Sequence, residues 1–536
     1  MKQQIPASDS DNDNKISDIN QGGFDNNNEL SEEYKRDILK RLFDSIDLHG
    51  DGYITKFIFV ETLKDRGIDS HDIRLINVMK ELSNYGRNEK IDFDSFCNVI
   101  GHNITIIEKI ITKNLVIPEF AEFRKDIENI YLETKKIDSG ALADYIPQLA
   151  RVNPDQYAVS ICTIDGQFLE YGNIENYFCI QSICKPINYC IALELNGEEY
   201  VHSHVGREPS GRSFNEIALN RHNLPHNPMI NAGAIMCSSL IHPEQDLADR
   251  FNYVSTIWQK LSGNARIGFN NSVYHSELST ADRNFALAHY MKEVGAFPAK
   301  TLIKDTVDFY FQNCAIELNS SNLAMVAATF ANAGFNPITG EKIFSLPTVQ
   351  NCLSLMYSCG MYDFSGEFAF TVGLPAKSGV SGGLMLVIPN VMGIALWSPK
   401  LDIMGNTVRG VEFSKQLVKQ FNFHNYDSLV GQSKKVDPRK DSFTANIEPV
   451  FQLIWAASQG DLNEIQQLFA KGIDLDSADY DGRTALHLAA AENQIDVVKF
   501  LISKNINLEP VDRWGKTPLA DAKTHENNDI VKLLTK

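Results

Sequence analysis

Hydrophobic residues recur near the start of the chain at the spacing of an amphipathic helix, one to four positions apart: Tyr34, Ile38, Leu42 and Phe43. A polar stretch interrupts the pattern, and a second helical pattern then runs through Phe59 and Leu63. We therefore expect residues 29–118 to form an all-helical domain.

The longest apolar run extends from Leu384 to Trp397 and is cut by Pro389-Asn390. A membrane-spanning helix needs about 20 consecutive apolar residues, so this run is too short and too interrupted to span a bilayer. It predicts two buried strands joined by a tight turn.

The end of the chain repeats with a period of 33 residues. Thr484 begins the run Thr-Ala-Leu-His-Leu-Ala, and Thr517 begins a related run 33 residues later. This period and this run are typical of ankyrin repeats, so residues 446–536 are expected to form them and the two threonines to start helices. Their function stays open between a partner-binding surface, with the partner unknown, and a packing cap on the same chain. We slightly favour the cap, because two or three repeats offer little concave surface.

The polar stretch between the first two helices resembles an EF-hand loop. Asp47 stands at its first position, Asp51 at its fifth and Gly52 at its sixth. The third position is His49, and the twelfth, normally a bidentate Glu, is Ile58. Without that Glu a hard cation loses two oxygen ligands, so we favour a metal-free packing module over a calcium site.

The composition is that of an acidic globular protein of 536 residues, with 68 Asp plus Glu against 50 Lys plus Arg and a formal charge of −18. This charge disfavours nucleic acid and anionic membranes as partners.

The nine cysteines form no C-x-x-C pair, which indicates free thiols in a reducing compartment and no zinc site. Residues 1–28 resemble neither a transit peptide nor a secretion signal, and predict a disordered tail and a cytoplasmic location.

The candidate chemistry begins at Ser182 and Lys185, which form the S-x-x-K arrangement of serine β-lactamase-like enzymes. This spacing places the hydroxyl and the amine one helical turn apart on the same face. Serine needs a neutral amine as base, and burial or a second cation would keep Lys185 unprotonated. If Ser182 opens the helix, its own N–H is free to stabilise an oxyanion.

A second element, Lys377-Ser-Gly379-Val380, precedes the apolar run and resembles the K-T-G of the same superfamily. Gly379 permits a close backbone approach beside the site, and the N–H of Val380 is the candidate for a second oxyanion donor. No S-D-N lies between the two elements, and Tyr362 is placed to replace it. From the residues alone, we favour the interpretation of Tyr362 and Tyr145 as core tyrosines with satisfied hydroxyls.

The region from about 140 to 420 resembles the glutaminase family, whose motifs it carries in order: Tyr145-Ile-Pro-Gln-Leu, Phe178-Cys-Ile-Gln-Ser182-Ile-Cys-Lys185-Pro, Val205-Gly-Arg-Glu-Pro-Ser-Gly, Pro225-His-Asn-Pro-Met-Ile-Asn231-Ala-Gly-Ala-Ile, Asp282-Arg-Asn284-Phe-Ala, Asp308-Phe-Tyr310-Phe-Gln, Ser358-Cys-Gly-Met-Tyr362-Asp-Phe-Ser-Gly and Leu374-Pro-Ala-Lys377-Ser-Gly-Val380. With its flanking regions, nearly the whole chain resembles the animal kidney-type members. The resemblance implies that residues 130–425 form an α/β domain of serine β-lactamase-like fold, with a mixed or antiparallel sheet and helices.

By resemblance, the catalytic set of the family falls on Ser182 as nucleophile, Lys185 as base, and Tyr145, Tyr362, Lys377 and Val380. The substrate-binding set falls on Ser182, Asn231, Glu277, Asn284, Tyr310, Tyr362 and Val380. The chemistry agrees, because an α-ammonium group needs a carboxylate and an α-carboxylate needs neutral donors. From the residues alone, Glu277 reads as a solvated loop charge.

The activity implied by the resemblance is hydrolysis of L-glutamine to L-glutamate and ammonia through a seryl acyl-enzyme, with no metal and no organic cofactor. Family members of the kidney type are activated by phosphate and assemble as tetramers. The loop from Gly206 to Asn220 resembles their gating loop, but it reads Asn215-Glu-Ile-Ala-Leu219 where the animal enzymes carry a Lys-Leu-Phe run. Phosphate is therefore only a candidate activator, and a homotetramer is an expectation.

Two other functions and one other location stay open at the level of sequence. A penicillin-recognising hydrolase shares the S-x-x-K element, but Asn231, Glu277 and Asn284 argue against it. An ankyrin scaffold with an inactive enzyme is disfavoured by the intact Ser182 and Lys185. The family resemblance gives mitochondria as the alternative to the cytoplasm.

Overall fold

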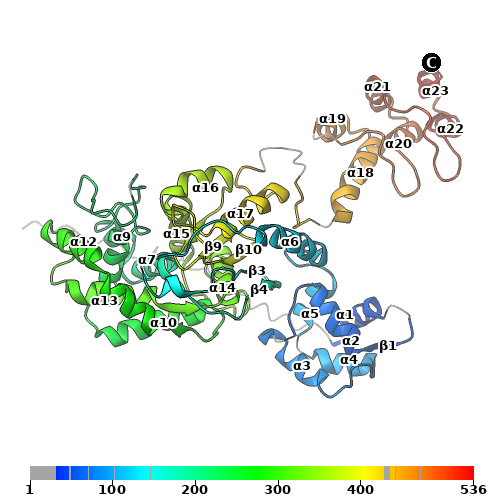
Figure 1. Ribbon diagram of the computed structural model, residues 1–536. Helices are drawn as coiled ribbons and strands as arrows, with labels where there is room; N and C mark the ends of the chain where they lie inside the picture. Colours follow the sequence, from blue (N-terminus) through cyan, green and yellow to red (C-terminus); the bar gives the residue numbers. More distant parts are fainter. Residues whose placement is uncertain are drawn as a thin grey trace, which may run out of the picture.

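The computed structural model describes residues 32–47, 50–70, 72–101, 103–144, 146–211, 213–427, 435–440, 442–470 and 473–535. They form an N-terminal helical module, a central α/β domain and a C-terminal row of paired helices (Figure 1). The predicted tail, 1–28, lies outside the described residues. In the part of the chain that is described, no helix is both long and apolar enough to cross a membrane.

The helices of the N-terminal module share one apolar core and are α1 (Glu32–Ile46), α2 (Lys56–Asp65), α3 (Ile76–Leu82), α4 (Phe93–Ile100) and α5 (Ile104–Ile111). The expectation of an all-helical region is wrong in one detail, because β1 (Tyr53–Thr55) and β2 (Lys90–Asp92) form a short antiparallel pair. Ile54 lies opposite Ile91 in this pair, and both side chains are buried. The strands therefore join the two helix–loop–helix halves of the module.

The EF-hand-like loop is closed by hydrogen bonds of its own. The carboxylate of Asp47 accepts from the N–H of Asp51 at 3.2 Å and of Gly52 at 2.8 Å. Ile58, at the position of the calcium-binding Glu, is half-buried and packs against the core of the module. His49 lies outside the described residues. Among those described, no three His, Cys, Asp or Glu side chains are grouped to hold a metal ion, and the metal-free interpretation stays a prediction.

The central domain is built on an antiparallel sheet in the order β4-β3-β10-β9-β8. Its strands are β3 (Ala158–Thr163), β4 (Phe168–Gly172), β8 (Ala376–Ser378), β9 (Gly383–Ile388) and β10 (Met392–Trp397). The predicted pair of buried strands is confirmed as β9 and β10, which turn at Asn390 with φ of +61°. Both strands are buried at every position because helices cover both faces of the sheet.

On one face of the sheet, α14 (Ser320–Ala331) packs against β3, β9 and β10. Gly393 permits this close approach, since a Cβ there would lie 2.1 Å from the backbone nitrogen of Ala328. The other face is covered by helices that share a second core: α6 (Phe120–Lys135), α16 (Ser365–Thr371) and α17 (Val408–Gln420). Helix α6 begins before the predicted domain start at 130.

The remaining helices of the central domain form a helical lobe and are α7 (Cys184–Asn196), α8 (Glu198–His202), α9 (Asn231–Ser239), α10 (Leu247–Leu261), α11 (Asn271–Ser279), α12 (Asp282–Glu293), α13 (Ile303–Cys314) and α15 (Leu346–Cys359). A small sheet in the order β5-β7-β6 ties the lobe together through β5 (Phe178–Cys179), β6 (Gly268–Phe269) and β7 (Ile316–Leu318). The pairing of β5 with β7 places the segment before Ser182 against the end of α13. All nine cysteines lie among the described residues, none is in a disulfide, and only Cys97 is not buried.

The C-terminal helices stack as repeats, with Thr484 and Thr517 at the starts of α20 and α22 as predicted. The helices are α18 (Ser442–Gln459), α19 (Leu462–Ala470), α20 (Ala485–Ala491), α21 (Ile495–Ser503), α22 (Pro518–Thr524) and α23 (Asn528–Leu534). Equivalent amides connect successive repeats: Gln494 donates to the carbonyl of Ser458, and Asn527 to that of Ala490. The repeats bury a core of their own and extend away from the central domain in Figure 1.

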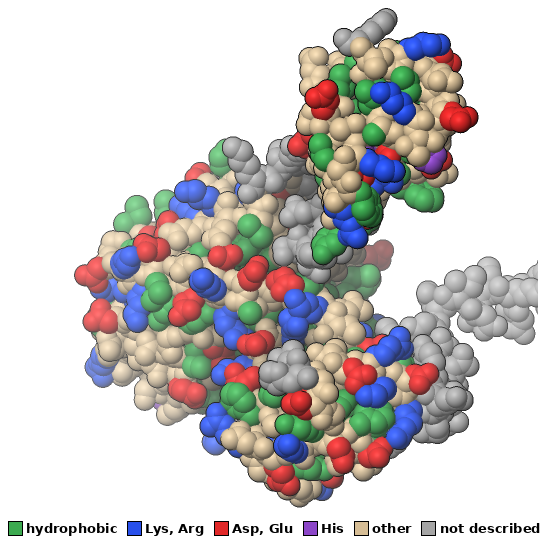
Figure 2. Space-filling model, turned by 90° about the vertical axis from the view of Figure 1, so that its right-hand side faces the viewer, with side chains coloured by type: hydrophobic (Ala, Val, Ile, Leu, Met, Phe, Trp, Pro, Cys, Tyr) green, Lys and Arg blue, Asp and Glu red, His purple; other side chains and the backbone are tan. Residues whose placement is uncertain are grey.

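Charged side chains of both signs are interspersed on the visible face of the module and the central domain (Figure 2).

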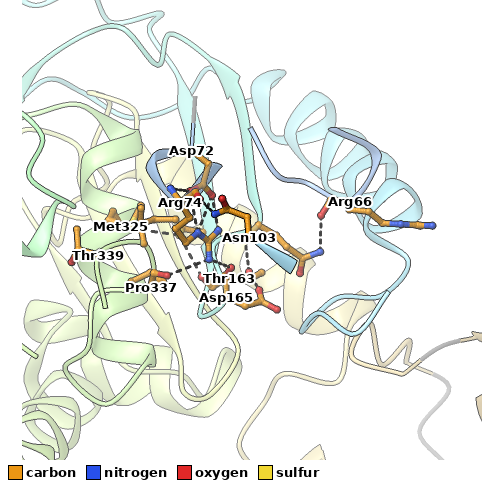
Figure 3. Close-up of polar contacts among 12 residues, drawn as sticks. Arg66, Asp72, Arg74, Asn103, Thr163, Asp165, Met325, Pro337 and Thr339 are labelled. Atoms are coloured by element: carbon orange, nitrogen blue, oxygen red, sulfur yellow. Dashed lines mark hydrogen bonds and ion pairs between the residues drawn. The ribbon is translucent and has the colours of Figure 1, made fainter. Parts of the chain in front are cut away.

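The N-terminal module is fixed to the central domain at the turn between β3 and β4 (Figure 3). Arg74 donates to the carbonyl oxygens of Asp165 at 2.8 Å and Pro337 at 3.5 Å, and its Nη2 pairs with the buried carboxylate of Asp72 at 2.6 Å. Gly166, in the turn, has φ of +85°, and a Cβ there would lie 2.4 Å from Nη2 of Arg74. Glycine is therefore needed both for the turn and for the contact.

Gln167, in the same turn, is fully buried and bridges three segments. Its Nε2 donates to the carbonyls of Arg66 at 2.9 Å and Ile117 at 2.8 Å, and its Oε1 accepts from the N–H of Ile117 at 3.0 Å. The neighbouring carboxylate of Asp165 accepts from the N–H of Val116 at 2.6 Å. The module, the linker and the turn are thus one hydrogen-bonded unit.

We expect Gln167→Ala to lower the free energy of unfolding by about 3 kcal/mol, because it leaves buried backbone groups of Arg66 and Ile117 without partners. Urea unfolding followed by tryptophan fluorescence measures this loss, since Trp258 and Trp397 are buried in the central domain. Gln466→Ala, at an exposed position of α19, is the control. Equal stability of the two variants would show that the bridge does not stabilise the fold.

Candidate active site

Ser182 and Lys185 meet where the chain passes from β5 into α7. Ser182 lies in a 3-10 turn, η3 (Gln181–Ile183), and Lys185 lies in the first turn of α7. Nζ of Lys185 donates to Oγ of Ser182 at 2.6 Å, and both side chains are buried. Burial lowers the pKa of Lys185, which favours the neutral amine that a general base requires.

A second buried lysine, Lys377, reaches the same pocket from β8. Its Nζ donates to the carbonyl of Ser378 at 2.7 Å and lies 4.5 Å from the ring centre of Tyr362. The pKa of Lys377 is held well below its ordinary value, first by burial and then by the charge of Lys185. The charge of Lys185 therefore favours the neutral form of Lys377, because two ammonium groups in one pocket repel each other.

Tyr362 lies in a 3-10 turn, η4 (Tyr362–Phe364), with φ of +53°. This backbone conformation is strained for a bulky residue and is held by packing on Val380 and Leu401. The hydroxyl of Tyr362 donates to the carbonyl of Ser378 at 3.0 Å, and burial raises its pKa while the hydrogen bond with Ser182 lowers it. Tyr145 lies outside the described residues, and its role stays a prediction.

Two backbone N–H groups are available beside Ser182. Among the described residues, the amides of Ser182 and Val380 have no backbone acceptor. Gly379 makes this possible, since a Cβ there would lie 2.7 Å from the carbonyl oxygen of Ile180, in the segment that leads to Ser182. The close approach brings the strand end and the helix start together, as an oxyanion hole requires.

The candidate residues for the amino-acid end come from four helices. Asn231 begins α9, Glu277 lies in α11, Asn284 in α12 and Tyr310 in α13. Nδ2 of Asn231 donates to Oδ1 of Asn284 at 3.0 Å, and the hydroxyl of Tyr310 donates to Oδ1 of Asn231 at 3.4 Å. The structure therefore brings these three neutral groups together.

Glu277 is buried on its helix, so the interpretation as a solvated loop charge is wrong. Burial raises the pKa of Glu277 to about 7, while hydrogen bonding from Gln181 and the charge of Lys185 oppose the shift. A buried carboxyl of this kind is well suited to receive a cationic group that restores its charge balance.

Gln181 is a site residue that the sequence motifs did not single out. Its Nε2 donates to Oε2 of Glu277 at 3.2 Å, and its φ is +48°, a strained value for a residue with a side chain. It directly precedes Ser182, so one strained turn orients both the nucleophile and the carboxylate. Only its adjacency to Ser182 offered a sequence signal.

The loop that follows Gly206 contacts the site through Phe214. The ring of Phe214 lies 4.7 Å from that of Tyr362, and the carbonyl of Phe214 accepts from the N–H of Asn231 at 2.9 Å. A cavity of about 360 Å³ lies beside this contact and is lined by Pro209, Ile230 and Asp363 among others. Both the nucleophile end and the amino-acid end are therefore connected to this loop.

The arrangement combines a serine hydroxyl, an amine that can be neutral and two backbone N–H groups without backbone acceptors. These are the groups that acyl transfer requires. Next to it stand a carboxyl and a cluster of amide and phenol groups, which complement an α-ammonium and an α-carboxylate. The geometry fits an amino acid with an acyl group on its side chain.

Comparison with known proteins agrees with this geometry. A family model described as Glutaminase matches residues 140–426, an EF-hand domain model matches 38–118, and a model of three ankyrin repeats matches 453–536. The chain is 46% identical to "Putative glutaminase 3" of Caenorhabditis elegans over 441 residues, 80% of this chain and 76% of the relative. It is 44% identical to "Glutaminase liver isoform, mitochondrial" of Rattus norvegicus over 435 residues, 80% of this chain and 72% of the relative.

Solved structures extend the comparison to the fold. One described as a probable glutaminase ybaS has 36% sequence identity and a TM-score of 0.54, and the match covers 56% of this chain and 97% of that structure. The match supports the predicted fold class of the central domain.

We expect the burial of Glu277 to make stability depend on pH. Its pKa is about 7 in the folded protein against an ordinary 4.5, so between these values the folded state binds more protons than the unfolded state. The free energy of unfolding therefore falls as the pH rises through this window, by on the order of 2–3 kcal/mol in total.

Glu277→Gln removes this titration, so its melting temperature without ligand should exceed that of the parent at pH 8, with the gain shrinking toward pH 5. Thermal denaturation at both pH values measures the effect, and Glu199→Gln, at an exposed position of α8, is the control. An equal pH dependence in the parent and in Glu277→Gln would contradict the buried, proton-binding carboxyl.

Proposed function

The chain belongs to the glutaminase family, and on that premise we propose that it hydrolyses the side-chain amide of L-glutamine to L-glutamate and ammonia through a seryl acyl-enzyme. The observation that carries the proposal is the 2.6 Å contact of Lys185 with Ser182 beside a pocket built for an α-amino acid. The steps follow from the positions of the groups.

In the first step, Oγ of Ser182 attacks the amide carbon while Lys185, as the neutral amine, takes its proton. The negative charge that develops on the amide oxygen is stabilised by the N–H groups of Ser182 and Val380.

Collapse of the tetrahedral intermediate requires a proton on the leaving nitrogen. Tyr362 lies beside Ser182. We propose that Tyr362 and Tyr145 together transfer this proton from Lys185 to the leaving nitrogen. Ammonia leaves, and a water molecule then attacks the ester with Lys185 again as base, which releases L-glutamate. No metal and no organic cofactor takes part in these steps.

Specificity is assigned to the amino-acid end of the pocket. The Glu277 carboxylate receives the α-ammonium group of glutamine, and Asn231, Asn284 and Tyr310 receive its α-carboxylate. Holding both charged ends places the side-chain amide against Ser182, which favours glutamine over simple amides.

We further propose a homotetramer in the cytoplasm, with phosphate as an activator that acts through the loop from Gly206 to Asn220. The alternative location is the mitochondrion, which the name of one relative gives for that protein. Light scattering with and without phosphate tests the assembly, and imaging of a fluorescent fusion tests the location.

We expect Ser182→Ala and Lys185→Met each to lower kcat by about 10³-fold or more, because each removes a partner of the nucleophile–base pair. The measurement is glutamine-dependent ammonia release by the full chain. Ser203→Ala, at an exposed serine after α8, is the matched control and should keep the parent activity. Full activity of Ser182→Ala would rule out the seryl acyl-enzyme.

We also expect the KM for glutamine to fall as the pH rises through about 7, because Glu277 binds the substrate's ammonium group in its ionised form. In Glu277→Gln this trend should vanish and KM should rise about 100-fold, the scale for a lost buried charge pair. Initial rates across glutamine concentrations at pH 6, 7 and 8 measure both, and Glu199→Gln serves as the control. A retained pH trend in Glu277→Gln would assign the titration to another group.

A further inference from the structure

A hydrogen bond between Tyr274 and Asp308 connects two of the helices that form the amino-acid end of the pocket. The hydroxyl of Tyr274 donates to Oδ1 of Asp308. Tyr274 lies in α11 one turn before Glu277, and Asp308 lies in α13 two residues before Tyr310. The helix that carries the carboxyl is therefore linked directly to the helix that carries the phenol.

The surroundings of Tyr274 keep this hydrogen bond in place. The ring is half-buried and lies 5.9 Å from the ring of Phe269. Burial, and then the hydrogen bond and charge of Asp308, raise the pKa of Tyr274 to about 12, so the hydroxyl stays a donor throughout the neutral range. A hydrogen bond to a carboxylate is stronger than one between neutral groups.

Helix α11 has a second anchor, but it lies at the other end of the helix from Glu277. The N–H of Asn270 donates to the carbonyl of Ala315 at 2.9 Å, and its Nδ2 donates to Oε1 of Glu317 at 2.7 Å. Asn270 also caps the helix by accepting from the N–H of Val273. The Tyr274 contact is nearer to Glu277 along the helix, so it holds the part of α11 from which that carboxyl extends toward Gln181.

We propose that Tyr274 and Asp308 are a positioning pair that fixes the separation of Glu277 from the Asn231–Tyr310 cluster. The pair thereby sets the affinity for the α-amino-acid end of the substrate. The inference rests on the proposed function of this pocket and adds residues that do not themselves contact substrate.

The test compares steady-state kinetics of the full chain carrying Tyr274→Phe, Asp308→Asn or both. Tyr274→Phe keeps the ring and removes the hydroxyl, and we expect KM for glutamine to rise about tenfold with kcat within about twofold, because uniform binding is lost and the chemistry is untouched. The double variant should match Tyr274→Phe, since both lack the hydroxyl that donates the bond, whereas Asp308→Asn keeps an amide oxygen that accepts it and should have the smaller effect. Tyr290→Phe, on the outer side of α12 with 37% exposure, is the control and should keep both parameters.

An unchanged KM in Tyr274→Phe overturns the positioning role, as does a lowered melting temperature with unaltered kinetics, which assigns the pair to stability alone. If the parent protein releases no ammonia from glutamine, the proposed function fails, and the pair is then judged by calorimetric titration with L-glutamate. In that titration a tenfold rise of Kd in Tyr274→Phe supports the pair, and an equal Kd overturns it.

Discussion

The free-energy cost of burying an ammonium group determines the protonation of the lysines in this site. The hydrogen bonds of Lys185 and Lys377 go to the hydroxyl of Ser182 and the carbonyl of Ser378, and both side chains are almost fully excluded from solvent. Water would stabilise their charged forms, and the surrounding core removes that water. Helix α7, which carries Lys185, is buried from Cys184 through Leu193. The apolar environment is therefore a direct cause of the chemistry and not only a source of stability.

The same burial acts in the opposite direction on Glu277. Desolvation makes a lysine less basic and a carboxyl less acidic, so burial disfavours the charged form at both ends of the pocket. Under the proposed function, a zwitterionic substrate restores the charge of Glu277 by bringing an ammonium group to it. Binding and ionisation are thus coupled, and the strained turn at Gln181 joins them, because it contacts Glu277 and leads directly into Ser182.

Sequence patterns predicted the parts of this protein that depend on local spacing. The hairpin of β9 and β10, the helix starts at Thr484 and Thr517, and the contact of Ser182 with Lys185 follow from runs, repeats and helical geometry. The contacts that depend on long-range packing did not follow. Nothing local to Glu277 shows that α11 will be buried, and nothing local to Gln167 shows that its amide will meet Ile117. The strained φ of Gln181 and Tyr362 was equally hidden, because both residue types usually avoid that conformation.

The attachment of the N-terminal module has a consequence for how the sequence can change over evolutionary time. Arg74 and Gln167 reach across the interface, but most of their acceptors are main-chain carbonyls, at Asp165, Pro337, Arg66 and Ile117. A carbonyl remains an acceptor whatever side chain its residue carries. Related proteins can therefore replace the residues that supply these carbonyls and still keep the hydrogen bonds between the module and the central domain. Arg74, Gln167 and Gly166, in contrast, tolerate little substitution. At this interface, the residues that supply carbonyl acceptors should vary among related sequences much more than the residues that supply the donor side chains.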